Sequence, residues 1–247
     1  AAQKVIKNKG APGIDGITYE QLPNLLRVHG EKIRQKLKNG TYIPAPVRRV
    51  DIPKPNGGTR MLGIPTLLDR TIQQAIVMTI GDSFEDQFSD KSYGFREGRN
   101  CQQAVQRAQE YIKDGNRWVV EMDLSKFFDR VNHDILMDRV SRVIDDKAIL
   151  KLIRRYLNAG IMEDGLVSPR LEGVPQGSPL SPLLSNIMLT ELDRELEERG
   201  LNHVRYADDC NIYVKSEKAA QRVLTNITKY VEGTLKLRVN RDKSGTF

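Results

Sequence analysis

The chain has 247 residues, of which 39% are hydrophobic and 29% are charged. These values lie close to the average of soluble globular proteins and exclude wholesale disorder. There is no run of roughly 18 apolar residues, which excludes a membrane-spanning helix, and Cys101 and Cys210 form no Cys-x-x-Cys pair. A disulfide framework, a zinc knuckle and a secretory leader all lack support, so we expect a reducing compartment, the cytoplasm.

The charge balance is basic, with 39 Lys and Arg residues against 32 Asp and Glu residues and a net charge of +7. A surplus of this sign favours a polyanionic partner, most often nucleic acid. A basic soluble protein without such a partner can have the same charge, so the count alone leaves both interpretations open.

The first half of the chain is predicted to be mainly helical, with one hairpin. Apolar residues spaced by three, four and seven predict a helix over residues 22–37. Two short extended segments flank the turn at residues 56–58, which predicts a β-hairpin. Long helical patterns follow at about residues 67–88 and 102–113.

The second half alternates strands and helices. Residues 118–122 are apolar except for Glu121 and predict a buried strand that leads directly into Asp123. Further helices are expected at about residues 133–143, 147–157, 183–199 and 217–231, and further strands at residues 203–206, 211–214 and 235–239. Because the strands form hairpins, we expect a largely antiparallel sheet and an α+β fold rather than a doubly wound one.

Three carboxylates stand where predicted strands end. Asp123 follows the strand at residues 118–122, and Asp208 and Asp209 share a tight turn between two strands. Ionised carboxylates at the ends of core strands cost free energy unless a cation or a partner compensates them. A pair of Mg²⁺ ions would relieve their repulsion, activate an attacking 3′-hydroxyl and stabilise a leaving pyrophosphate. A lone Asp-Asp pair is more often a solvated turn; the preceding aromatic residue and the apolar strands around this one weaken that interpretation without removing it.

Five segments resemble, in order, the motifs of one family. Tyr206-Ala207-Asp208-Asp209 resembles the catalytic box of reverse transcriptases. Residues 121–129 resemble their first metal-binding motif, and residues 173–182 resemble their Pro-Gln-Gly loop. The segments Ser92–Arg99 and Lys9–Thr18 narrow the resemblance to the bacterial group II intron-encoded reverse transcriptases, or maturases. The resemblance covers nearly the whole chain.

This resemblance implies the fingers and palm of a right-hand polymerase. It assigns residues 1–115 mainly to the fingers, with an N-terminal extension motif, and residues 116–247 mainly to the palm, with fingers elements returning at about 131–175. Family members continue into a helical thumb and further domains, whereas this sequence stops inside a motif like the palm–thumb junction. We therefore expect the thumb to be absent here and processive synthesis to be poor. Palm surface left bare by the thumb would also permit a homodimer.

The resemblance also assigns the site residues. It implies that Asp123 and Asp208 are the principal ligands of two Mg²⁺ ions, supported by Asp209. It implies nucleotide contacts for a second set of side chains: Lys54 and Arg60 at the triphosphate, Phe128 against the sugar, Gln176 in the Pro-Gln-Gly loop, and Lys243 as a proton donor to pyrophosphate. Without the family, Phe128 could equally be a core residue and the cations a solvated face.

The RNA contacts are expected to come from arginines. Arg48 and Arg49 flank the predicted hairpin, and Arg96 and Arg99 lie in the Ser92–Arg99 segment. Positive charge there would give salt-dependent affinity for a template backbone. Residues 191–199 carry charges on most sides and predict a solvated helix face.

The implied activity is RNA-directed DNA polymerisation by a group II intron maturase. Deoxynucleotides would be added to a primer 3′-end on an RNA template, and binding of intron RNA would assist splicing and mobility. Two alternatives stay open: an RNA-binding splicing cofactor without significant polymerase activity, and a non-intron bacterial reverse transcriptase. A metal-dependent nuclease has little support, because no His or Glu cluster joins the acids.

Overall fold

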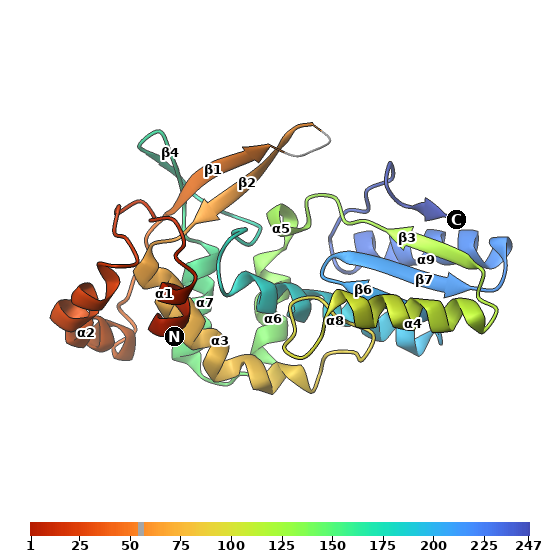
Figure 1. Ribbon diagram of the computed structural model, residues 1–247, viewed down its shortest axis with the longest axis horizontal. Coiled ribbons are helices and arrows are strands. Elements are labelled where there is room, and N and C mark those ends of the chain that lie inside the picture. The colour runs from red at the N-terminus through yellow and green to blue at the C-terminus, as the bar shows by residue number, and fades with distance from the viewer. Residues whose placement is uncertain (54–56) are drawn as a thin grey trace. The chain divides into compact units, whose positions relative to one another are not determined.

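The computed structural model describes residues 1–53 and 57–247 (Figure 1). The chain divides into two compact units, each assembled from two separate stretches. Unit 1 comprises Ala1–Asp82 and Leu136–Ser181, and unit 2 comprises Ser83–Ile135 and Pro182–Phe247. The α+β class expected from the sequence is confirmed. The naming of the two units as fingers and palm stays a prediction, with the unit boundary after Asp82 rather than near residue 115.

Unit 1 is built on a four-stranded sheet of order β2-β1-β4-β5. Its strands are β1 (Val47–Pro53), β2 (Thr59–Ile64), β4 (Ile161–Glu163) and β5 (Leu166–Ser168). The helices found mainly in this unit are α1 (Ala2–Lys7), α2 (Leu22–Lys38), α3 (Leu67–Glu85), α6 (His133–Ser141) and α7 (Lys147–Leu157). The predicted hairpin is confirmed, because β1 and β2 pair antiparallel. Gly57 and Gly58 directly precede β2 and have φ values of 86° and 79°, which favour glycine.

Unit 2 is built on a second four-stranded sheet, of order β6-β7-β3-β8 (Figure 1). Its strands are β3 (Trp118–Met122), β6 (Asn202–Tyr206), β7 (Asp209–Val214) and β8 (Gly245–Thr246). Its helices are α4 (Cys101–Lys113), α5 (Phe127–Arg130), α8 (Ser181–Glu198) and α9 (Glu217–Gly233). All pairings in this sheet are antiparallel, as predicted, whereas unit 1 contains one parallel pair, β1 with β4.

The two faces of the unit 2 sheet carry different side chains, because successive residues of a strand point to opposite faces. Val204 and Tyr213 face α4 and pack in one cluster with Tyr111, whose ring lies 5.6 Å from that of Tyr213. Their neighbours along the strands, including His203 and Ile212, face the other way and are fully buried. The sheet is therefore covered on both faces over this part of its length.

One predicted strand is wrong. Residues 235–239 form no ladder, apart from a single bridge between Leu124 and Val239. The alternation that suggested a strand is real, since Leu235, Leu237 and Val239 are buried. Lys236 between them has a φ of 56°, which an extended strand cannot include. The last pairing is made instead by β8, which lies against β3.

A buried carboxylate holds three segments of unit 1 together. Asp69, near the start of α3, accepts hydrogen bonds from the hydroxyls of Tyr42 at 2.7 Å and Tyr156 at 3.2 Å. It also accepts bonds from the Thr66 hydroxyl at 2.7 Å and from the Ala45 amide at 3.2 Å. Burial raises the pKa of Asp69, although these four donors oppose the shift.

Among the described helices, none is long and apolar enough to span a membrane.

Replacing Asp69 by Ala should destabilise the chain by about 3 kcal/mol or more, because it leaves buried hydroxyl and amide donors without an acceptor. Urea denaturation would measure the loss. Asp82→Ala, an exposed aspartate of the same helix, is the matched control and should change stability by less than about 0.5 kcal/mol. Equal midpoints for the two variants would contradict this role of Asp69.

Candidate active site

The pairing of β3 with β7 brings two of the predicted acids together in unit 2. The register runs from Trp118 opposite Val214 to Met122 opposite Cys210. Continued by one step, it sets Asp123 opposite Asp209. Met122 and Cys210 are buried, so the alternation of the strands turns the two carboxylates to the other face of the sheet.

The electrostatics of Asp209 agree with this placement. Desolvation raises the pKa of Asp209, and the negative charge of Asp123 raises it further, while the positive charge of Lys243 lowers it. Like charges opposite each other on neighbouring strands destabilise a sheet. The site therefore carries negative charge that a cation would relieve.

Asp123 is held by a turn that the sequence prediction missed. The Asn240 side-chain amide donates to the Asp123 carboxylate at 2.8 Å, and the Asn240 backbone amide donates to the Asp123 carbonyl at 2.9 Å. The Ser244 hydroxyl accepts from the Asp123 backbone amide at 3.0 Å. The polar run at residues 240–244 was a signal, but it pointed only to Lys243.

Asp208 lies on a two-residue turn closed by the pairing of Tyr206 with Asp209. Ala207, the first residue of that turn, has a φ of 58°, which is strained for a residue with a side chain. Gly94 packs against this turn so closely that an added Cβ would lie 2.9 Å from the Cα of Ala207. Asp208 itself is half-buried.

Residues 191–199 largely form the solvated helix face that the sequence predicts, since Arg194, Glu197, Glu198 and Arg199 are exposed. Asp193 is the exception. Asp193 of α8 is fully buried and forms an ion pair with Arg205 of β6, which is fully buried as well. Asn186 lies about two helical turns before Asp193 on the same face of α8. It is buried, and its side-chain oxygen accepts a hydrogen bond from Arg205. Polar residues at helical spacing on an otherwise apolar helix were the signal that could have revealed them.

The donor chemistry fits a hard cation such as Mg²⁺, because the acids offer only oxygen ligands. Among the described residues, however, no group of three or more His, Cys, Asp and Glu side chains is gathered as a metal site. Asp123, Asp208 and Asp209 are thus not preassembled as a three-ligand cluster. A site of this kind completes its coordination with waters and substrate phosphates.

The two aromatic residues after Asp123 differ in burial. Phe127 is buried in the core, and Phe128 is half-buried with its ring edge-on to Phe127, at 5.1 Å between centroids. Contact of Phe128 with a sugar stays a prediction. Lys243 is exposed and lies near enough to Asp209 to lower its pKa.

The other predicted nucleotide contacts belong to unit 1. Arg60 is exposed on β2, opposite Ile52 of β1. Gln176 is half-buried, and its carbonyl accepts a bond from the Gly63 amide at 2.9 Å, which fastens the Pro-Gln-Gly loop to β2. Gly177 has a φ of 101°, so the loop shape requires glycine there. Lys54 lies outside the described residues.

The arginines predicted to contact RNA differ in their surroundings. Arg48 is half-buried on β1, and Arg49 is paired with Asp51 and Glu163. Both line a groove of about 590 Å³ in unit 1.

Arg96 and Arg99 belong to unit 2. The Arg96 side chain is 4% exposed and donates to Glu85 and to the carbonyls of Ser89 and Ser92, which argues against a template contact. Arg99 is partly exposed, pairs with Asp90 and lies 5.6 Å from the ring of Tyr93.

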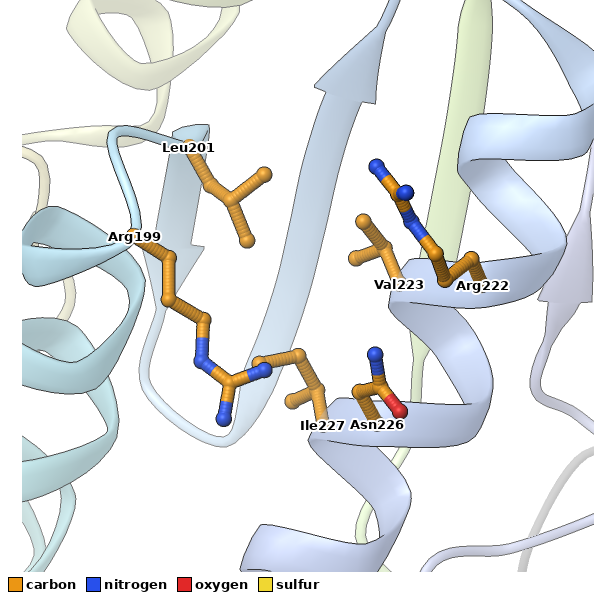
Figure 2. A pocket seen from close by; sticks show the side chains of 6 residues that line it. All are labelled: Arg199, Leu201, Arg222, Val223, Asn226 and Ile227. Carbon is orange, nitrogen blue, oxygen red and sulfur yellow. The ribbon is translucent and has the colours of Figure 1, made fainter.

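A groove elsewhere in unit 2 contains none of the predicted site residues. It has a volume of about 320 Å³ and an apolar floor, with two arginines beside it (Figure 2). Its lining residues are Arg199, Leu201, Arg222, Val223, Asn226 and Ile227. Asp123, Asp208 and Asp209 do not line this groove.

Comparison with known proteins identifies the class. The family described as reverse transcriptase (RNA-dependent DNA polymerase) matches residues 52–247, and the chain belongs to this family. In fold it resembles telomerase from Candida albicans, with a TM-score of 0.63 and 13% identity over 93% of this chain and 46% of that one.

Two relatives are closer in sequence. Protein YkfC of Escherichia coli K12 is 38% identical over 99% of this chain and 74% of its own length. The group II intron-encoded protein LtrA of Lactococcus lactis subsp. cremoris is 40% identical over 78% of this chain. The chain covers only 32% of LtrA. The resemblance to the intron-encoded branch is thereby confirmed.

The close packing of Gly94 on the acid turn predicts that Gly94→Ala displaces the turn. The added methyl group would meet the Ala207 backbone, and overpacking of this kind costs about 1–3 kcal/mol. Thermal denaturation would measure the cost. Gly233→Ala is the matched control in the same unit, because its added Cβ has open space around it and the change should be neutral or slightly stabilising. A Gly94→Ala variant as stable as the control would contradict the contact.

Proposed function

We propose that the chain catalyses RNA-templated DNA synthesis, with Asp123, Asp208 and Asp209 as the acids of the polymerase. The single observation that carries this proposal is the pair of carboxylates set opposite each other across β3 and β7. Their mutual repulsion raises the pKa of Asp209 after the effect of burial. Repulsion between neighbouring carboxylates is relieved when a cation binds to them.

The proposed cofactor is a pair of Mg²⁺ ions held by the three carboxylates. When bound, Mg²⁺ supplies Lewis-acid activation of the primer 3′-hydroxyl and neutralises charge on the departing pyrophosphate. In the reaction the 3′-oxygen bonds to the α-phosphorus of a deoxynucleoside triphosphate, the bond to the β-phosphate oxygen breaks, and the hydroxyl proton is lost to solvent. Asn240 and Ser244 keep Asp123 in place through this exchange.

We propose roles for the remaining site residues as part of the same function. Phe128 would exclude a sugar 2′-hydroxyl, Arg60 and Lys54 would bind the triphosphate, Gln176 would contact the nucleotide, and Lys243 would donate a proton to pyrophosphate. Lys243 has the most direct support, because its charge acts on Asp209.

We further propose that the RNA partner is a group II intron, as the name of LtrA suggests for that relative. The net charge of +7 suits binding of any RNA. It therefore supports equally the alternative of a splicing cofactor whose acids are vestigial. Only activity separates the two.

Primer extension on an RNA template with Mg²⁺ and deoxynucleotides tests the proposal, in the full-length protein that contains this chain. Asp208→Ala should reduce extension by at least about 10³-fold while RNA affinity stays unchanged, since loss of a metal ligand removes transition-state stabilisation. Asp114→Asn, an exposed acid of the same unit, is the control and should extend normally. Equal extension by Asp208→Ala would refute the acid assignment, and intact RNA binding without any extension in the unmodified protein would favour the splicing cofactor.

Replacing Phe128 by Ala should increase use of ribonucleotides relative to deoxynucleotides by roughly 10- to 100-fold, because steric exclusion in a site is worth about 1–3 kcal/mol. The ratio of kcat/KM for the two substrates measures it. An unchanged ratio in an active variant would make Phe128 a core residue only.

A further inference from the structure

Arg205 is the largest side chain that the described part of the protein buries completely. A buried guanidinium is tolerated only when charge and hydrogen bonds replace water around it. Here the replacement is thorough. The Nε and Nη2 atoms donate to the two carboxylate oxygens of Asp193 at 2.8 and 2.6 Å, and Nη1 donates to the Asn186 side chain at 3.0 Å.

One further hydrogen bond of this guanidinium goes to the turn that carries Asp208. Nη1 of Arg205 also donates to the carbonyl of Ala207 at 2.8 Å. Ala207 is the residue with positive φ, and Asp208 is next to it in the chain. The guanidinium therefore fixes one peptide group of the two-residue turn from the buried side of the hairpin.

The same network fastens the second surface of the turn. The Asn186 amide donates to the Gly94 carbonyl at 2.9 Å, and Gly94 is the residue packed against Ala207. The backbone of Arg205 pairs with the segment before Gly94, through bonds of 2.9 Å to the Lys91 carbonyl and from the Tyr93 amide. The turn is thus held between an arginine and a glycine, both of which are positioned by α8.

The geometry points to Arg205 and Asp193 as positioning residues of the polymerase, whose bonds to the Ala207 carbonyl and to α8 set where Asp208 and Asp209 are presented. This inference rests on the proposed function, because it takes those two acids as the reacting site. The network does not neutralise the acids itself, since the charge of Arg205 is matched by Asp193.

Stability alone does not explain the pair. A buried ion pair can be replaced by apolar side chains of similar volume with little or no loss of stability. A bidentate arginine is different from such residues in fixing direction, because its planar fork holds several acceptors at once. Burial opposes the charge of Arg205, but Asp193 and, more weakly, Asp208 raise its pKa, so the guanidinium stays charged beside the turn.

The test uses the full-length protein with the double substitution Arg205→Met and Asp193→Leu, which keeps the interior apolar and filled. We expect kcat for primer extension to fall roughly 10- to 100-fold, with KM for the deoxynucleotide and affinity for RNA changed by less than about threefold. Hydrogen exchange of the backbone amides in residues 206–210 should accelerate at least about tenfold, while exchange in α9 stays the same.

Arg155→Met is the matched control. Arg155 also donates to two backbone carbonyls, those of Gly40 and Tyr42 at 2.8 and 2.6 Å, but it does so in unit 1. Its loss should lower stability without changing exchange at residues 206–210 or kcat per folded molecule. If the double variant does not fold, Arg205→Lys serves instead, since a lysine cannot hold Asp193, Asn186 and Ala207 together.

Unchanged exchange at residues 206–210 in the folded variant would overturn the inference, and so would an unchanged kcat. If the unmodified protein itself extends no primer, the proposed polymerase function fails. The exchange measurement still decides whether Arg205 and Asp193 hold the turn, so the two failures are distinguishable.

Discussion

Asp123 and Asp209 face each other because β3 and β7 pair in one register, and most of unit 2 maintains that register against the repulsion it creates. A slip of one residue would turn the carboxylate of the strand that slips toward the buried face, where Met122 and Cys210 now lie. The free energy gained by burying the apolar face thus offsets the repulsion between the carboxylates on the other face. The turn at residues 240–244 holds Asp123 at the end of β3, and the network around Arg205 holds the turn that leads into β7.

Both units use a buried carboxylate to join separate elements: Asp69 bonds residues up to 87 positions away, and Asp193 joins α8 to β6. Asp69 is held in unit 1 by neutral hydroxyl donors, whereas Asp193 is matched by a guanidinium. A hydroxyl donor can adapt the direction of its hydrogen bond, because the hydrogen rotates about the C–O bond. A guanidinium fork does not, and this suits a place where a backbone turn needs a fixed position.

The sequence alone predicted most helices and strands, because their apolar periodicities are strong, and it predicted the acids through their motifs. It failed at Leu235–Val239, where buried alternation without a ladder imitates a strand, and at β4 and β5, which are too short to show a pattern. It also assigned Arg96 to RNA and Asp193 to solvent, although both are buried. For Arg96 the sequence held no signal of burial, since only tertiary pairing separates a charged residue buried with its partner from an exposed one. For Asp193 the helical spacing from Asn186 was a signal.

The discontinuous composition of the two units affects the order in which a ribosome can supply them. Unit 1 is complete once residue 181 has been made, whereas unit 2 still lacks its second stretch, Pro182–Phe247. β3 gains its sheet partners only when β7 and then β8 emerge, the latter more than a hundred residues after β3. Pairing over such separations is slow, and units tend to fold in the order of their synthesis. The acid-bearing strand therefore stays without its sheet partners until β7 and β8 have been synthesised, and this is the interval in which a chaperone would have most to protect.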